Sequence, residues 1–593
     1  MKPGHAPRII LPAGRSRLLA ALLLLGLAGL AGRAAYLQGM HNGFLQQKGE
    51  SRYSRVLEMS ANRGMITDRR GEPLAISTPV ESVWSSPQDM NATPEQLRKL
   101  ANLIDLDIKE LRQRLEGPRR GPQGGIHGSR KPEPKRDFVY LKRHLSPEVA
   151  ARIVELNMPG VFLKREYRRY YPAGELTAHV LGFTDVDDKG QEGIELAWQD
   201  ELAGKPGSRR VIKDRKGHIV EDVESIRAPR SGENIALSID SKIQYLAYRE
   251  LKQAMEVNKA KAGGIVVLDA QTGEVMALVN LPAYNPNNRA SMKAGRARNR
   301  ALTDVFEPGS TLKPFTIAAA LEAGSITPDT VFETAPGTFS IGRATIRDAH
   351  QEGPLTVAQV IQKSSNVGSA KIALSLPPQT LWEMLSEAGF GTPTGSGFPG
   401  EVGGKLRPYH TWRPIEQATM SYGHGIAVSL LQLARAYTLF SGQGELKPVS
   451  LLRLDSVPPG KRVLSPDTAL AVSRMLEMVA QPGGTAPQAQ ISGYRVAGKT
   501  GTAHKLEGNG YAKNRYLSTF VGYAPASNPR FVIAVMLDEP SAGQYFGGAV
   551  AAPVFSRVMA GALRLLNVPN DAPIGSVMSL TAAPGPKDGK GDV

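Results

Sequence analysis

The sequence predicts an α+β protein: a body with an antiparallel sheet and a helical subdomain, preceded by a mixed module and one transmembrane helix. Three observations lead to this fold class. A single long apolar run lies near the N-terminus, at residues 18 to 37. Two pairs of β-rich runs lie far apart, at residues 263 to 279 and 517 to 537. Helical patterns occupy the sequence between these pairs.

The apolar run predicts a membrane anchor. Residues 18 to 32 read LLAALLLLGLAGLAG, and if Arg33 reaches toward the interface, residues 18 to 37 supply about 20 residues, enough to span a bilayer. Residues 1 to 17 form a basic tail, which the positive-inside rule keeps in the cytoplasm. A cleaved signal peptide is the competing interpretation, because Gly29 and Ala31 are small enough for a signal peptidase.

The remainder divides by composition. Residues 50 to 230 mix short apolar runs with basic clusters and predict a non-catalytic module, in which residues 117 to 136 form a flexible insertion rich in Gly, Pro and basic residues. Residues 233 to 567 carry the β-rich runs and the helical patterns, and predict the main α+β domain. The tail at residues 568 to 593 is rich in Pro, Gly and Lys, which predicts disorder.

Local patterns place the elements of the main domain. Residues 263 to 279 are two β-rich runs joined by a turn at Thr272 and Gly273, which predicts a hairpin. The runs at residues 517 to 524 and 531 to 537 predict a second hairpin across Pro529. Helices are predicted within three stretches, at residues 314 to 323, 355 to 375 and 428 to 441.

Composition excludes several kinds of chemistry. The 593 residues include no cysteine, which rules out thiolate nucleophiles, disulfides and cysteine-ligated metals. The ten histidines show no ligand spacing, so neither a metal site nor another cofactor is expected. The net charge of +17 lies largely in flanks and loops without aromatic residues to stack on bases, which argues against nucleic-acid binding.

Two glycine motifs are interpreted as coincidences. Residues 493 to 500 (GYRVAGKT) match the P-loop pattern, but no helix-forming sequence follows, and the residues before Gly498 are expected to form a strand that runs into it. Residues 395 to 400 (GSGFPG) match a dinucleotide-binding pattern, but Pro399 stands where its helix would begin. Neither supports nucleotide binding.

Residues 310 to 313 (STLK) carry the strongest chemical signal. Pro314 is tolerated only in the first turn of a helix, so Ser310 is expected near a helix N-terminus, with Lys313 one turn later on the same face. A hydroxyl needs a base to become a good nucleophile, and a desolvated amine near other cations can serve as one. A serine helix cap beside a surface lysine is the alternative interpretation of this motif taken by itself.

Two further motifs change that balance. Ser364 and Asn366, in QKSSNVG, begin 54 residues after Ser310, and Lys499, Thr500 and Gly501, in AGKTGT, lie another 135 residues along. The order S-x-x-K, S-x-N, K-T-G is typical of serine β-lactamases and penicillin-binding proteins. On an edge strand, the third motif would offer a cation, hydroxyls and a free backbone edge to an extended peptide that ends in a carboxylate. Gly501 would let the peptide backbone approach closely.

With these motifs the sequence resembles the class B penicillin-binding proteins, most closely their division-specific septal transpeptidases, the penicillin-binding protein 3 group. The likeness covers about residues 17 to 565, while the insertion at 117 to 136 and the tail match nothing in the family. The segments that carry it are residues 62 to 75, 168 to 182, 190 to 195, 213 to 220, 303 to 313, 362 to 368, 497 to 502 and 545 to 555.

The resemblance implies a β-lactamase-like transpeptidase fold at residues 233 to 567 behind a pedestal or dimerisation module. It also implies roles for individual residues. Ser310 would attack the D-alanyl-D-alanine bond of a peptidoglycan stem peptide, with Lys313 as base. Ser364 would relay a proton and Asn366 would bind the substrate amide. The residues expected to hold the terminal carboxylate or line the strand are Lys499, Thr500, Gly501 and Thr502, with the backbone N–H groups of Ser310 and Thr502 as oxyanion hole.

The resemblance further implies the partners and the location. The acyl group would pass to an amine of a neighbouring stem, and β-lactams would mimic the donor. A septal polytopic glycosyltransferase and other division membrane proteins are expected partners, with the chain in the inner membrane, its N-terminus inside and its catalytic domain in the periplasm. Three alternatives stay open: a D,D-carboxypeptidase, a serine β-lactamase, and a non-enzymatic β-lactam sensor or division scaffold.

Overall fold

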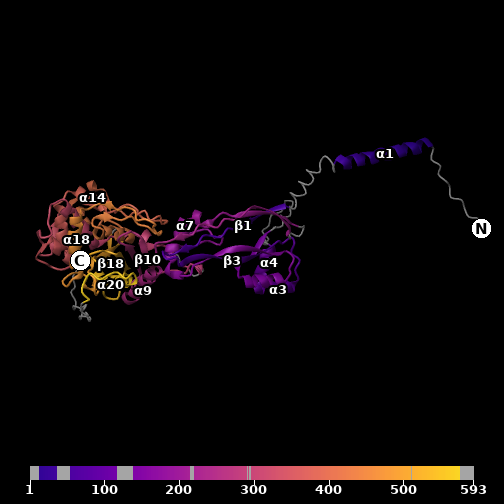
Figure 1. The fold of residues 1–593 in the computed structure, drawn as a ribbon. Coiled ribbons are helices and arrows are strands. Elements are labelled where there is room, and N and C mark those ends of the chain that lie inside the picture. Colours follow the sequence, from indigo (N-terminus) through magenta and orange to yellow (C-terminus); the bar gives the residue numbers. More distant parts are fainter. Residues whose placement is uncertain are drawn as a thin grey trace, which may run out of the picture. The chain divides into compact units, whose positions relative to one another are not determined.

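The computed structural model describes residues 13–36, 54–116, 138–213, 219–289, 292, 295–508 and 510–574. The chain forms two compact units. Figure 1 labels helices and strands of both. Unit 1 comprises residues 1–62, 79–167 and 204–231, and unit 2 comprises residues 63–78, 168–203 and 232–593. Each unit is therefore built from segments that are separated in sequence. The expected insertion at 117 to 136 and most of the expected tail lie outside the described residues.

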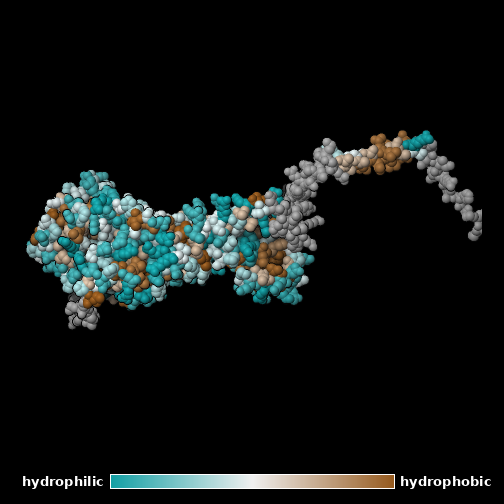
Figure 2. Space-filling view, viewed as in Figure 1, coloured by the Kyte–Doolittle hydropathy of each residue, from teal (hydrophilic) through white to brown (hydrophobic). Residues whose placement is uncertain are grey.

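The predicted anchor is a helix. α1 spans Ala13–Ala35, and its residues Gly14–Ala35 are long and apolar enough to cross a bilayer. Its leucines are exposed to the surroundings, as the brown side chains along this helix in Figure 2 show. A second helical stretch of similar length, Gly547–Leu565, is about half buried inside unit 2. That stretch comprises two consecutive helices of unit 2, Gly547–Val550 and Ala552–Leu565, whereas α1 has the character of a membrane anchor.

Besides α1, the described part of unit 1 combines two small sheet regions with three helices. In the first region β1 (Ser54–Met59), β6 (Gly207–Lys213) and β7 (Ile219–Arg227) pair antiparallel. In the second, the end of β3 (Pro73–Ser85) pairs with β4 (Val139–Leu145). β5 (Val161–Tyr170) also pairs with β3. The helices are α3 (Pro94–Leu103), α4 (Ile108–Glu116) and α5 (Pro147–Glu155). Their apolar faces meet around Leu100, Leu111 and Leu141, which form a separate core.

Segments 63–78 and 168–203 of unit 2 join around a buried ionic cluster. Here β2 (Ile66–Thr67) pairs with β3 and lies parallel to β8 (Ile235–Ala236), near η2 (Gly174–Leu176) and the short helices α6 (Ala178–Leu181), α7 (Gly193–Ala197) and α8 (Gln199–Ala203). The buried carboxylate of Glu195 accepts hydrogen bonds from Arg63 and Arg169, each at 2.6 Å. Breaking a buried ion cluster by removing one member typically costs about 3–5 kcal/mol. Three of the family-like segments, separated in sequence, therefore share one charge network.

The centre of unit 2 is a five-stranded antiparallel sheet in the order β10-β9-β19-β18-β17. The predicted hairpin at 263 to 279 is β9 (Ala262–Asp269) with β10 (Val275–Leu281), and the second is β18 (Gly510–Ala524) with β19 (Phe531–Asp538). β9 and β19 pair from Asp269 and Phe531 onward, which joins the two hairpins into one sheet. The prediction of an antiparallel sheet is confirmed. β17 (Ala497–Glu507) is its edge strand.

Helices cover both faces of this sheet. Adjacent strand residues point to opposite faces, and a Cβ at Gly263 would meet Leu251 of α9 (Ser241–Asn258), whereas one at Gly264 would meet Leu430 of α16 (Leu430–Ala436). α9 packs with α20 (Ala552–Leu565). All eight residues of β9 are consequently buried.

The helical subdomain lies between the hairpins in sequence. It contains α11 (Lys313–Glu322), α12 (Val357–Lys363), α13 (Asn366–Leu374), α14 (Pro378–Glu387), α15 (Pro414–Met420), α17 (Thr438–Ser441) and α18 (Pro466–Ala480). Short elements complete the unit: α10 (Arg300–Thr303), α19 (Gly547–Val550), η4 (Gly309–Leu312), η5 (Tyr409–Thr411), η6 (Pro487–Ala489), β11 (Val331–Glu333), β12 (Thr338–Ile341), β13 (Ala344–Arg347), β14 (Pro354–Thr356), β15 (Glu445–Leu446) and β16 (Lys461–Arg462).

The structure differs from the predicted bounds of two helices and one strand in unit 2. The predicted helix within 355 to 375 is two helices that separate at Ser364, and that within 428 to 441 is two helices that separate at Tyr437. The strand expected from Tyr494 begins only at Ala497. The residues before it form an isolated bridge between Ile491 and Tyr494. Lys499 lies inside a strand, so the P-loop pattern is a coincidence, as expected.

Candidate active site

Ser310 lies where the chain enters α11. It belongs to the single turn η4, and α11 begins at Lys313 with Pro314 in its first turn, as the sequence predicted. Gly309 has φ +57°, which lets the chain turn sharply just before the serine. The Ser310 side chain is only partly buried, and its Oγ is 3.0 Å from Lys313 Nζ. A hydroxyl and a candidate base are therefore in hydrogen-bond contact.

Lys313 is completely buried and surrounded by acceptors. Its Nζ donates to Asn366 Oδ1 at 2.8 Å, to Ser364 Oγ at 3.2 Å and to the Ser364 carbonyl oxygen. Burial lowers its pKa to about 7, and the charge of Asp348 opposes this shift only in part. Near neutral pH a large fraction of Lys313 is therefore a neutral amine, which can accept the Ser310 proton.

Ser364 joins the first motif to the third. Its Oγ lies 3.2 Å from Lys313 Nζ and 2.9 Å from Lys499 Nζ. The residue ends α12 in the left-handed region, with φ 62° and ψ 38°, a conformation that costs a non-glycine residue roughly 1–2 kcal/mol. This turn separates α12 from α13 and directs the hydroxyl at both amines. The local strain thus lies at the residue whose hydroxyl contacts both buried amines.

Lys499 is the second buried amine. Burial, with a smaller contribution from the nearby Lys313 cation, lowers its pKa well below the usual value. Among the described residues no carboxylate forms an ion pair with either lysine. Two buried amines without a carboxylate ion pair keep their N–H groups available to the site, which suits an anionic ligand or a developing oxyanion.

The strand of the third motif passes directly beside the turn that holds Ser310. A Cβ at Gly501 would lie 2.8 Å from the Pro308 carbonyl oxygen and 3.0 Å from Thr311 Cγ2, and one at Gly309 would lie 3.5 Å from the Thr502 carbonyl oxygen. A side chain at Gly501 would therefore force the strand away from the turn. β17 pairs with β18 on one side only, so its other edge has no strand partner among the described residues.

The arrangement of three motifs around one serine agrees with comparisons to known proteins. A family model described as the penicillin-binding protein transpeptidase domain matches residues 263–560, and one described as the penicillin-binding protein dimerisation domain matches residues 58–237. The chain belongs to the class B penicillin-binding proteins. The resemblance stated from the sequence is thereby confirmed.

Relatives of this penicillin-binding protein match along nearly its whole length. A relative in Neisseria meningitidis named probable peptidoglycan D,D-transpeptidase PenA is 44% identical over 92% of both chains. Peptidoglycan D,D-transpeptidase FtsI of Escherichia coli is 42% identical over 94% of this chain and 93% of its own. Among solved structures, the apo TP domain of Burkholderia pseudomallei penicillin-binding protein 3 is 51% identical, with a TM-score of 0.53, and covers 57% of this chain and 98% of that one.

The threonines of this penicillin-binding protein's third motif are held from the neighbouring segments. Thr500 Oγ1 is 2.9 Å from Thr485 Oγ1, and Thr500 is largely buried. Thr502 is partly exposed, and its Oγ1 accepts a hydrogen bond from the Gly547 N–H at 3.1 Å. The Thr502 hydroxyl hydrogen therefore remains available to a ligand carboxylate.

Sequence reasoning did not identify Asp348, which positions the second motif. Its carboxylate accepts hydrogen bonds from the Ser365 hydroxyl at 2.6 Å, from the Val367 N–H at 2.9 Å and from the Asn366 N–H, all at the start of α13. A negative charge at a helix N-terminus is favourable. Nothing in the sequence marks this residue, because it lies in the loop after β13 and reaches α13 only in the folded chain.

Asn366 is held in one orientation by two contacts. Its Oδ1 accepts from Lys313, and its Nδ2 donates to the Arg347 carbonyl oxygen at 2.8 Å. The amide nitrogen carries a second hydrogen, which is left for a ligand. All eight residues predicted for the site thus lie in one region of unit 2, around Ser310 and the edge of β17.

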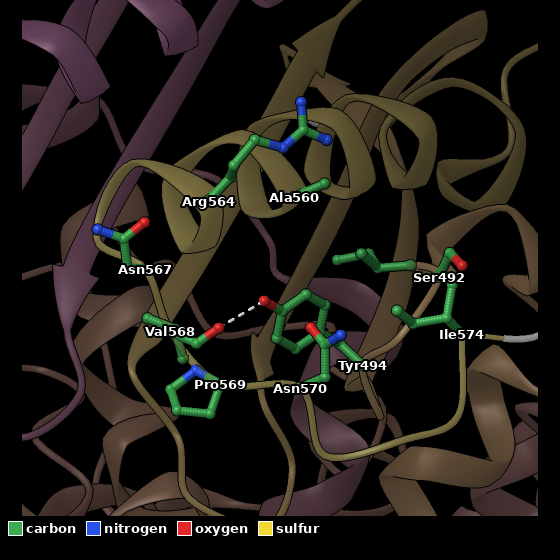
Figure 3. Close-up of a pocket in the computed structure, with 10 residues that line it drawn as sticks. Ser492, Tyr494, Ala560, Arg564, Asn567, Val568, Pro569, Asn570 and Ile574 are labelled. Carbon is green, nitrogen blue, oxygen red and sulfur yellow. Dashed lines mark hydrogen bonds between the residues drawn. The ribbon is translucent and has the colours of Figure 1, made fainter.

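A cavity of about 630 Å³ lies elsewhere in unit 2, beside the end of α20 (Figure 3). Its lining includes Tyr494, Arg564 and Val568, and the Tyr494 hydroxyl donates to the Val568 carbonyl oxygen at 2.6 Å. It contains no residue of the three motifs. In the described part of the chain no group of His, Asp and Glu side chains has the geometry of a metal site.

Proposed function

We propose that this protein is a peptidoglycan D,D-transpeptidase whose nucleophile is Ser310. Ser310 Oγ attacks the carbonyl between the last two D-alanines of a stem peptide while neutral Lys313 takes its proton. D-Alanine leaves after its nitrogen receives a proton through Ser364, and the serine ester remains. An amine of a second stem then attacks the ester, which closes the cross-link and restores Ser310. The relatives named D,D-transpeptidase at 42–44% identity support this activity.

The contact between Ser310 and a buried amine whose pKa is about 7 carries the proposal. Lys499, Thr500 and Thr502 bind the terminal carboxylate of the donor, and the peptide lies along the unpaired edge of β17. Gly501 allows this strand to pass close to the turn that carries Ser310. Asn366 donates to the donor amide. The backbone N–H groups of Ser310 and Thr502 stabilise the oxyanion, which is typically a large contribution to catalysis. β-Lactams occupy the same groups and leave Ser310 acylated.

We further propose where the reaction takes place. α1 anchors the chain in the inner membrane with residues 1 to 17 inside, and residues 233 to 567 catalyse cross-linking in the periplasm at the division septum. The module at residues 50 to 230 and α1 contact a polytopic septal glycosyltransferase and other division proteins. The length and composition of α1 and the relationship to FtsI support this arrangement. Exchange of α1 for an unrelated membrane helix should weaken binding to the septal glycosyltransferase without changing the rate of penicillin acylation.

Labelling by a fluorescent penicillin tests the chemistry. The wild type is expected to form an adduct that persists for many minutes, and Ser310→Ala is expected to form none while it retains the wild-type melting temperature. Rapid turnover of the label would indicate a β-lactamase instead. With a D-alanyl-D-alanine donor, release of D-alanine without transfer to an added amine would indicate a carboxypeptidase, and a folded protein that never acylates would indicate a scaffold.

A further inference from the structure

A glycine turn brings two rings beside the residue that precedes the nucleophile. The Gly309 N–H donates to the Gly423 carbonyl oxygen at 3.3 Å. Gly423 has φ +87°, and a Cβ there would lie 2.2 Å from the Gly309 carbonyl oxygen. The two backbones therefore touch, and Tyr422 and His424 are the chain neighbours of the glycine that contacts the turn carrying Ser310.

The imidazole of His424 is enclosed by rings. Its centroid lies 5.1 Å from that of Tyr422 and 5.8 Å from that of Tyr511 on β18. The Glu307 carboxylate fixes this arrangement, because it accepts from the Gly425 N–H at 2.8 Å and from the Tyr511 hydroxyl at 3.0 Å. Within the described residues, neither ring nitrogen of His424 has a hydrogen-bond partner, in contrast to His179 and His504. A ring nitrogen is thus left for a ligand.

Titratable groups on three neighbouring segments interact electrostatically with His424. Glu307 lies on the segment before η4, Lys313 on α11, and His504 on β17. Burial lowers the pKa of His424, and the Lys313 and His504 charges act in the same direction, whereas Glu307 opposes them. The imidazole is therefore neutral at neutral pH and can accept a proton.

The proposed reaction leaves one proton without an acceptor. An acceptor amine of ordinary pKa, about 10.4 for a lysine-like amine, enters as an ammonium, which has no lone pair for attack. Lys313 and Ser364 are already needed for the proton that moves between the attacking nitrogen and Ser310 Oγ. A base near Ser310 that converts bound ammonium to amine would speed transfer at neutral pH, where only a small fraction of the acceptor is free amine.

The geometry points to His424 as that base, an inference that rests on the proposed transpeptidase function. The ammonium of the acceptor gives one proton to an imidazole nitrogen of His424 and becomes an amine. Its lone pair forms the C–N bond to the acyl carbon as the bond from that carbon to Ser310 Oγ breaks, and the second proton passes through Lys313 to Ser310 Oγ. His424 then releases its proton to water. Acylation by a penicillin involves no acceptor and does not use this step.

A comparison of His424→Gln with His410→Gln tests the inference in the full-length protein. His410 lies on the exposed turn η5, so its substitution controls for loss of a histidine. Two rates are measured on each variant: acylation by a fluorescent penicillin, and transfer of the acyl group of a D-alanyl thioester donor to D-alanine as acceptor. We expect His424→Gln to acylate within two-fold of wild type and to transfer at least ten-fold more slowly, since general bases typically contribute about 10²–10⁴-fold.

The pH dependence of transfer separates a proton acceptor from a packing role. Because Lys313 gives acylation and transfer a shared rise near pH 7, the ratio of the transfer rate to the acylation rate is compared at each pH. This ratio should rise with pH in the wild type as His424 loses its proton, and in His424→Gln it should lack this limb but recover as the pH approaches the pKa of the free acceptor. The inference is overturned if His424→Gln transfers at the wild-type rate, if it loses acylation and transfer equally, or if its pH profile keeps the limb. A wild type that acylates but never transfers would instead refute the transpeptidase function itself.

Discussion

Replacement of Lys313 by methionine should stabilise the protein while it removes activity. The lysine is completely buried and lacks a carboxylate ion pair in the described structure, and its pKa falls from 10.5 to about 7. Because a pKa change of one corresponds to about 1.36 kcal/mol, burying the protonated form costs up to about 5 kcal/mol at low pH. Methionine fills a similar volume but leaves Ser310, Ser364 and Asn366 without this donor, which offsets about 1 kcal/mol each. A net gain of about 2 kcal/mol remains.

The gain must depend on pH in a defined direction. Between about pH 7 and pH 10.5 the unfolded chain binds a proton on Lys313 that the folded chain does not, so wild-type stability rises with pH over this window. Lys313→Met lacks this contribution. Its advantage over wild type is therefore complete below pH 7 and shrinks as the pH approaches 10.

Thermal unfolding followed by tryptophan fluorescence at pH 6.5, 8 and 9.5 measures this difference. At pH 6.5 we expect the melting temperature of Lys313→Met to exceed that of wild type by about 2–4 °C. The exposed Lys242→Met serves as the matched control and should stay within about 0.5 kcal/mol of wild type at every pH. Two results would refute the conclusion that burial lowers the pKa of Lys313 to about 7: a variant that melts below wild type at pH 6.5, or a gain in stability that does not change with pH.

Three further outcomes are expected. Acylation by penicillin should rise with pH to a plateau, with a midpoint near 7 set by Lys313, as measured by stopped-flow labelling. Asp348→Ala should slow acylation about ten-fold and lower stability by about 2 kcal/mol, because three donors at the start of α13 lose their acceptor. If Asp348→Ala and wild type acylate at equal rates, Asp348 is not needed to position Ser364 and Asn366. Gly501→Ala should abolish labelling, since its Cβ would lie 2.3 Å from Thr519 Oγ1, whereas Gly353→Ala, which meets nothing within 4 Å, should label normally.

Local sequence determined much of this protein. The apolar run produced α1 because side chains without polar groups favour a bilayer whatever the rest of the chain does. The hairpins β9–β10 and β18–β19 followed from alternating β-rich runs that pair across short turns. Pro314 fixed the start of α11, which placed Ser310 and Lys313 on one face. Each of these depends on residues close together in the chain.

Only the tertiary structure decided the chemistry of the site. Lys499 meets Ser364 across 135 residues, and the low pKa of both lysines arises from burial by segments distant in sequence. A helix boundary near Ser364 was signalled by Ser365, which caps α13, but the left-handed conformation of Ser364 and the contacts of its hydroxyl with two amines arise only in the folded chain. Asp348 was missed for the same reason: its partners are brought to it by packing. Motifs name the reacting groups, whereas desolvation and long-range contacts set their protonation and geometry.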